Sequence, residues 1–172
     1  MAITPTCAET QETNFDIVQI IPFFVGEIKH AVPFNVIQPT VSAADLGAAS
    51  ISILIKGIPR FAISEQFDET GSLISHDMEA ATVDSSNEAS VAGDTHKVVL
   101  TFKAIGAGAT YVRAVHALQV YPCEFIVVGD ANRYAFIRCP DMGYKCTVKD
   151  TGDVRTVSIE INNINGLQYI ME

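Results

Sequence analysis

"FIVVGDANRYAFIRC", residues 125–139, consists of two apolar runs joined by the polar corner GDANR. Gly, Asp and Asn favour turns, so this pattern predicts a β-hairpin. Residues 125–128 are apolar at every position rather than at alternate positions, which indicates a strand covered on both faces. The hairpin therefore needs a cover, which could be the rest of this chain, a second copy of it or a ligand.

The hairpin belongs to a series of short strands. The segments 123–129, 133–139, 143–149 and 154–162 are rich in β-branched and aromatic residues and are separated by the turn sequences GDANR, PDMG and TGD. The sequences YKCTVKD and VSIEIN alternate apolar and polar residues, as a strand with one buried face does. The sequence therefore predicts a mainly β protein, an antiparallel β-sandwich or barrel.

One helix is expected just before this series. HKVVLTFKA, residues 96–104, alternates like a strand, and the period then changes in GAGATYVRAVHALQV. At helical spacing Tyr111, Ala114, Val115 and Leu118 form one apolar stripe, which predicts a packed helix over 108–119. Pro122 prevents much continuation of that helix.

The N-terminal half gives weaker signals. Segment 15–39 is rich in apolar residues but contains three prolines, so two or three short extended pieces are expected there. Ile51, Ile53 and Ile55 alternate and predict a strand over 50–56, and a second short strand is expected near 60–64.

Most of the excess negative charge lies in one segment. The chain has twenty acidic and eleven basic residues, and residues 65–94 hold eight of the acids and no Lys or Arg. Without a firm periodicity, 65–95 is interpreted as a long acidic loop or arm. The acids are candidate residues of an inter-subunit or lumen-facing loop, and they are Glu65, Asp68, Glu69, Asp77, Glu79, Asp84, Glu88 and Asp94.

Length and composition are those of one domain over residues 1–172. Apolar residues make up 48% and charged residues only 18% of the chain, which favours burial against other subunits beside an ordinary core. Residues 1–14 are interpreted as a flexible arm with no signal peptide, and no apolar run is long enough for a membrane span. We expect synthesis in a reducing cytoplasm and free thiols.

No motif specifies a chemistry, so we expect no enzyme activity, no cofactor and no metal. Ser75, His76 and Asp77 are adjacent, whereas a catalytic triad converges from separate places, so they are interpreted as polar loop residues. GAGAT, residues 106–110, lacks the glycine spacing of a dinucleotide loop and is interpreted as a strand-to-helix corner. In a two-residue hairpin, Cys139 would oppose Tyr144 and Cys146 would oppose Ile137, with both thiols on one face.

The order of elements carries a resemblance. Early strands, the long segment 65–95, a strand, one helix and a four-strand meander resemble the tail-tube family of tailed bacteriophages and related injection machines. The stretch "YPCEFIVVGDANRYAFIRCPDMGYKCTVKDTGDVRTVSIEINNINGLQYI", residues 121–170, is similar in style to small virion proteins of phages. The resemblance covers about 96–172 and implies a β-sandwich flanked by a helix, with a loop that reaches a neighbouring subunit.

The resemblance implies a structural subunit of a phage tail or head–tail connector, made in the bacterial cytoplasm and located in the virion. Its expected partners are copies of itself in rings or stacked rings and other virion proteins, with passive contact to DNA in a lumen. An acidic lumen would repel phosphates, so no sequence-specific nucleic acid binding is expected. The apolar hairpin at 125–139 would supply the interface between subunits, through Phe125, Val127, Tyr134 and Phe136.

Two other classes stay open. One is a monomeric small β-barrel that binds a lipid or carbohydrate, with 65–95 as its lid. The other is an enzyme whose site leaves no sequence motif. Size in solution separates the first alternative from the assembling subunit.

Overall fold

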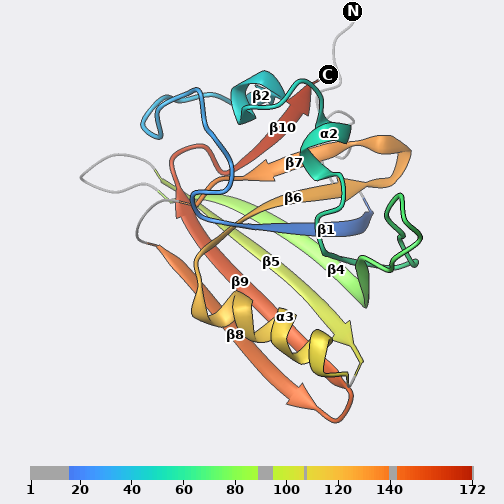
Figure 1. Cartoon of the computed structure of the whole chain (residues 1–172). Coiled ribbons are helices and arrows are strands. Elements are labelled where there is room, and N and C mark those ends of the chain that lie inside the picture. Colours follow the sequence, from blue (N-terminus) through green and yellow to red (C-terminus); the bar gives the residue numbers. More distant parts are fainter. Residues whose placement is uncertain (1–15, 89–94, 107, 140–142, 172) are drawn as a thin grey trace, which may run out of the picture.

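The computed structural model describes residues 16–88, 95–106, 108–139 and 143–171. Within these ranges the chain is mainly β, as expected (Figure 1). The strands of the N-terminal half are β1 (Ile17–Phe24), β2 (Thr40–Ser42), β3 (Arg60–Ala62) and β4 (Ser75–Glu88). Those of the C-terminal half are β5 (Thr95–Ile105), β6 (Cys123–Gly129), β7 (Tyr134–Ile137), β8 (Tyr144–Thr151), β9 (Val154–Asn163) and β10 (Leu167–Met171). The helices are η1 (Ala44–Leu46), α2 (Ile51–Ile55), α3 (Ala109–Val120) and η2 (Asp130–Asn132).

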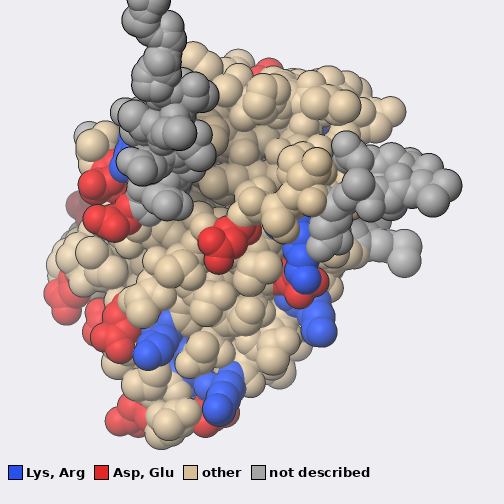
Figure 2. Space-filling view, turned by 180° about the vertical axis from the view of Figure 1, so that it is seen from behind, with Lys and Arg blue, Asp and Glu red and all other residues tan. Residues whose placement is uncertain are grey.

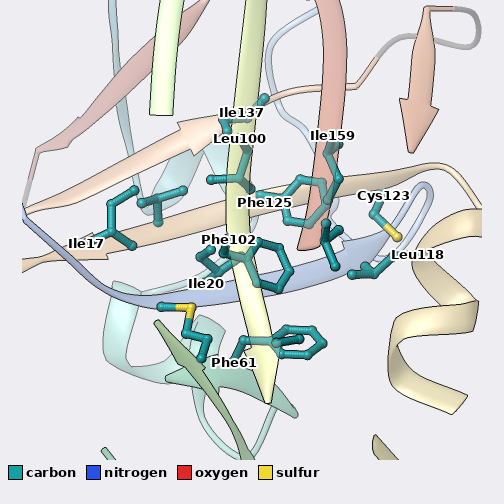
Figure 3. Close-up of a cluster of buried hydrophobic side chains, with 14 of the residues drawn as sticks. Ile17, Ile20, Phe61, Leu100, Phe102, Leu118, Cys123, Phe125, Ile137 and Ile159 are labelled. Carbon is teal, nitrogen blue, oxygen red and sulfur yellow. The ribbon is translucent and has the colours of Figure 1, made fainter. Parts of the chain in front are cut away.

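The described strands form one sheet in the order β2-β10-β7-β6-β1-β3-β4-β5-β9-β8. We call the strands β2, β10, β7, β6, β1 and β3 the first half-sheet, and the strands β4, β5, β9 and β8 the second half-sheet. The main hydrophobic cluster takes side chains from both half-sheets and from α3, so the sheet folds over on itself. Figure 3 shows side chains of β1 and β6 meeting those of β5 and β9 in this cluster.

The hairpin at 125–139 is covered by its own chain. β6 is buried along its whole length and pairs with β1 on one side and β7 on the other. Phe125 and Val127 enter the cluster between the half-sheets. Ile126 and Val128 enter a second cluster, which η1, α2 and the segment around Ile28 complete on the opposite face. The sequence predicted that residues 125–128 form a strand covered on both faces, and contacts within one chain provide that cover.

The interpretation of this hairpin as a subunit interface needs correction. Phe125, Val127 and Phe136 are 0% exposed, and Tyr134 is partly buried against the second cluster. The first three side chains have no exposed area and cannot contact another molecule, whereas for the partly exposed Tyr134 the interface role stays a prediction. Sequence pattern could not separate the two cases, because a strand buried by its own chain and one buried by a neighbour have the same composition.

The segment 65–95 is not one long loop, since 75–88 is the strand β4, which pairs with β5 from Met78 to Glu88. Met78, Ala81 and Val83 pack on the main cluster. The register shifts between Glu79 and Thr82, and Ala80 has φ 52°. This bulge inserts one residue and breaks the alternation of apolar and polar residues. The sequence pattern therefore did not indicate a strand here.

The prediction of a strand over 50–56 is wrong, because Ile51–Ile55 is the short helix α2. The Ser50 side chain accepts a hydrogen bond from the Ile53 backbone N–H at 3.2 Å and caps the helix. Ile51 is 1% exposed and Ile53 is 61% exposed, so alternate isoleucines do not share a buried face. The sequence interpretation followed the isoleucine alternation alone and did not consider Ser50 as a helix cap.

In segment 15–39 the described residues form one strand, β1, rather than two or three pieces. Pro22 lies inside β1 opposite Phe125 of β6. β1 pairs with β3 only through Gln19 and Ile20. Pro22 lacks a backbone N–H, but no hydrogen bond to β3 is lost at this position.

The helix expected over 108–119 is α3, with Tyr111, Val115 and Leu118 buried as predicted. The strands expected after it are present, but they do not form one meander. β6 and β7 form a hairpin in the first half-sheet, whereas β8 and β9 form a hairpin in the second. Cys146 therefore lies opposite Ile159 and not opposite Ile137, which corrects the expected placement of Cys139 and Cys146 on one hairpin.

Candidate functional site

The eight acidic candidates do not gather in one loop. Glu65, Asp68 and Glu69 precede β4, and the Asp68 carboxylate accepts hydrogen bonds from the Thr70 hydroxyl at 2.8 Å and the Ser72 backbone N–H at 2.8 Å. These bonds lower the pKa of Asp68 below its ordinary value. Glu69 forms an ion pair with Lys56. This group holds a surface turn together.

The remaining acidic candidates follow β4. Asp77, Glu79 and Asp84 are exposed, and the backbone of Glu88 ends the strand. Asp94 lies outside the described residues, as does the N-terminal arm, residues 1–14. β4 therefore presents a line of carboxylates along the border of the second half-sheet.

Lysines occupy the other strands of this half-sheet. Lys97 and Lys103 lie on β5, and Lys145 and Lys149 lie on β8. Glu79 pairs with Lys103 across the strands, and the Lys97 Nζ lies 3.3 Å from Glu160 Oε1 on β9. Figure 2, turned by 180° from Figure 1, shows acidic side chains gathered at the left margin and basic side chains mainly in the lower and right parts, with some acidic side chains beside them.

The second half-sheet has two open strand edges in the described part of the chain. β3 pairs only with residues 75–77 of β4, so the rest of β4 has a strand neighbour on the β5 side alone. β8 is the last strand of the order, so its side away from β9 is also open. Such edges carry unpaired N–H and C=O groups that can pair with another strand.

The pairing pattern shows which β8 residues direct their backbone groups outward. The Asn162 N–H donates to the Gly143 carbonyl at 3.1 Å, so this is a hydrogen-bonded pair. Hydrogen-bonded and open pairs alternate in antiparallel ladders. Tyr144, Cys146, Val148 and Asp150 therefore point their N–H and C=O groups toward the open edge, while Lys145 and Lys149 add their charges on the exposed face.

No known family model, curated protein or solved structure matches this chain. The function must therefore be argued from its own surfaces and buried groups.

The other sequence candidates do not converge on a reactive centre. Ser75, His76 and Asp77 begin β4, which corrects their interpretation as loop residues. The Ser75 hydroxyl accepts from the Gln66 N–H at 2.8 Å, and His76 lies between the rings of Phe61 and Tyr111. Gly106 and Gly108 do form the corner between β5 and α3.

A group of thiols lies near Tyr144. Its hydroxyl donates to the Leu118 carbonyl at 2.6 Å, and Cys123 is fully buried beside it. Burial raises the pKa of Cys123 to about 12 and the pKa of Cys146 to about 11. In the described part of the chain, no three His, Cys, Asp or Glu side chains come close enough to share a metal ion.

These raised pKa values predict slow alkylation of the folded chain. At pH 8 both thiols are protonated, because the pH lies well below about 11, and the thiolate is the reactive form. Iodoacetamide treatment followed by peptide mass spectrometry should label Cys123 and Cys146 only after urea unfolding. Rapid labelling of either residue in the native chain would contradict the burial of this group.

Sequence reasoning missed two buried residues with ionisable side chains, Glu124 and Arg60. Glu124 is 2% exposed in β6, where its Oε1 lies 2.8 Å from His30 Nε2 and its Oε2 accepts from the Cys139 N–H at 3.1 Å. This pair ties the segment after β1 to the sheet. Arg60 in β3 is 6% exposed. A sequence signal for its burial was available, because it is the single charged residue in the apolar run GIPRFAI.

No helix in the described ranges has the length and apolar character needed to cross a bilayer.

Proposed function

We propose that this chain is a non-enzymatic structural subunit that assembles with copies of itself into a ring or tube with a DNA-passing lumen. In this proposal it belongs to the tail or head–tail connector of a bacteriophage, is made in the host cytoplasm and ends in the virion. The observation that carries the proposal is the pair of open edges of the second half-sheet, acidic along β4 and basic along β8.

Strand direction supports edge-to-edge joining. β4 is antiparallel to β5, β5 to β9 and β9 to β8, so β4 and β8 run in opposite directions. If β8 of one copy lies beside β4 of the next, every neighbouring pair in the joined sheet is antiparallel. The contact uses two different surfaces of the same molecule, so repeated contacts close into a ring or continue as a filament.

Charge supports the same arrangement. Lys145 and Lys149 of one copy would face the acids Glu79 and Asp84 of the next. Two copies joined through identical edges would instead bring like charges together. Opposite charges across a contact select partner and register more than they add affinity.

The free face of the second half-sheet would line the lumen, because the first half-sheet and α3 cover its other face. Its described charged side chains are equal in number, four acidic and four basic. They are Asp77, Glu79, Asp84, Glu160, Lys97, Lys103, Lys145 and Lys149. A balanced wall gives DNA little net attraction, so the duplex can pass without sticking. The lumen therefore does not have to be lined by acidic residues alone for DNA to pass through it.

The test is the size of the full chain in solution. Sedimentation velocity over a range of concentrations, with electron microscopy of the same samples, should show rings or tubes that grow with concentration. A single species of 18.6 kDa at every concentration would overturn the proposal. That outcome would favour the monomeric module that binds a lipid or carbohydrate.

A further inference from the structure

A largely apolar pocket of about 200 Å³ lies between α3 and the strands β1 and β3. The apolar side chains that shape it are those of Phe24, Ile58, Phe61, Ala114, Ala117 and Leu118. Two of the three that α3 contributes are alanines, and their small side chains leave the space open. An engineered apolar cavity of roughly 150 Å³ holds benzene, so this pocket has room for a small aromatic molecule.

His76 brings a polar side chain into this pocket. It pairs with Phe61 in the parallel ladder between β3 and β4, so both side chains lie on the face of the sheet toward α3. Its ring lies 5.5 Å from that of Phe61 and 6.1 Å from that of Tyr111, measured between centroids. Within the described residues, neither nitrogen of the imidazole has a hydrogen-bond partner.

The described lining residues direct no positive charge into the pocket. The guanidinium of Arg60 bonds to Gln19 and to the Ile55 carbonyl on the opposite face of the sheet. Glu27 is exposed at the rim, where its Oε1 accepts from the Phe24 backbone N–H at 2.6 Å. A carboxylate in the pocket would lose its hydration and gain no opposite charge, so the pocket favours uncharged molecules.

The imidazole of His76 can accept a hydrogen bond at neutral pH. Burial lowers the pKa of His76, and the charge of Asp77 opposes this only in part. The ring is therefore uncharged at pH 7, with one N–H donor and one acceptor nitrogen. The hydroxyl of a phenol is more acidic than that of an aliphatic alcohol and is a stronger donor to such a nitrogen. An aromatic ring also packs well against aromatic walls.

We propose that this pocket binds an uncharged phenol. The hydroxyl donates to the acceptor nitrogen of His76, and the aromatic ring packs against Phe61, Ala117 and Leu118. None of the walls comes from β8 or from the part of β4 beyond Asp77. The proposal therefore does not depend on the joining of strand edges.

The experiment is isothermal titration calorimetry of the full chain at neutral pH with p-cresol, p-xylene and benzoate, with the assembly state of each sample measured by sedimentation. The probe p-xylene has the shape of p-cresol, with a methyl group in place of the hydroxyl. We expect saturable binding of p-cresol and at least about tenfold weaker binding of benzoate, whose charge would be buried without a partner. Absence of p-cresol binding would overturn the site, and equal affinity for benzoate would overturn its preference for uncharged molecules.

His76→Phe tests the hydrogen bond, because it keeps an aromatic ring beside Phe61 and Tyr111 and removes both nitrogens. The hydroxyl of p-cresol would then be buried without a partner, so its binding should weaken about tenfold. The affinity for p-xylene should stay within about twofold, because this probe makes no hydrogen bond. If the substitution changed the affinities for the two probes equally, or changed neither, the contact with His76 would be wrong.

The location of binding is tested by Ala117→Leu, which fills the pocket and should weaken p-cresol binding at least about tenfold. Ala109→Leu makes the same change on an exposed turn of α3 outside the pocket, and should leave binding unchanged. Thermal unfolding shows whether each variant folds, and the comparison of p-cresol with benzoate on the unaltered chain needs no variant. Unaltered p-cresol binding to folded Ala117→Leu would refute the assignment.

Discussion

Phe125→Ala is expected to lower the free energy of unfolding by about 3–5 kcal/mol, the usual cost of removing a fully buried aromatic side chain. Phe125 is 0% exposed and lies in the cluster between the two half-sheets, where it meets Leu100 and Ile159 from the opposite side (Figure 3). The cavity that it leaves cannot collapse easily, because strands of both half-sheets hold its walls. Urea unfolding followed by circular dichroism measures the change.

Phe67→Ala is the matched control for this measurement. Phe67 is 57% exposed, so the same substitution should change the free energy of unfolding by no more than about 0.5 kcal/mol. If Phe125→Ala kept its stability and instead lost the ability to associate, the burial of the hairpin by its own chain would be wrong. The hairpin would then be an interface after all.

Reversal of either charged edge is expected to prevent assembly, which is the second large effect. Lys145→Glu with Lys149→Glu makes the β8 edge acidic, so it would face the acids of β4 in the next copy. Like charges placed across a contact are costly, and about 2 kcal/mol would weaken association roughly thirtyfold. All four substituted or facing side chains are exposed, so the fold should persist.

The complementary variant makes this prediction specific. Glu79→Lys with Asp84→Lys makes the β4 edge basic, and this chain should also fail to assemble alone. A mixture of the two variants restores opposite charges at every junction, so sedimentation should show assembly of alternating subunits. Failure of the mixture while the unaltered chain assembles would show that β4 and β8 do not meet.

Local patterns predicted much of the fold correctly. α3 was predicted because its apolar stripe has helical spacing, and β5, β8 and β9 because each has one buried and one exposed face. The hairpin of β6 and β7 follows from turn residues between apolar runs. In each case the local period and the final environment agree, so no distant contact was needed to decide the element.

The errors arise where one residue changes the meaning of a pattern. The bulge at Ala80 displaced the alternation in β4, and the Ser50 cap turned an alternating isoleucine run into α2. The open edges of the second half-sheet were missed for another reason. They depend on which strands pair, and β3 covers only residues 75–77 of β4.

By itself, the sequence determined that this chain is mainly β, contains a packed helix near 108–119 and has a strand at 125–128 that is covered on both faces. Those properties follow from side-chain period and turn chemistry, which act over a few residues. Only the tertiary structure decided what covers that strand, which edges stay open and which ionisable side chains are buried. These depend on how the sheet folds over on itself, and contacts between distant segments leave no local period in the sequence.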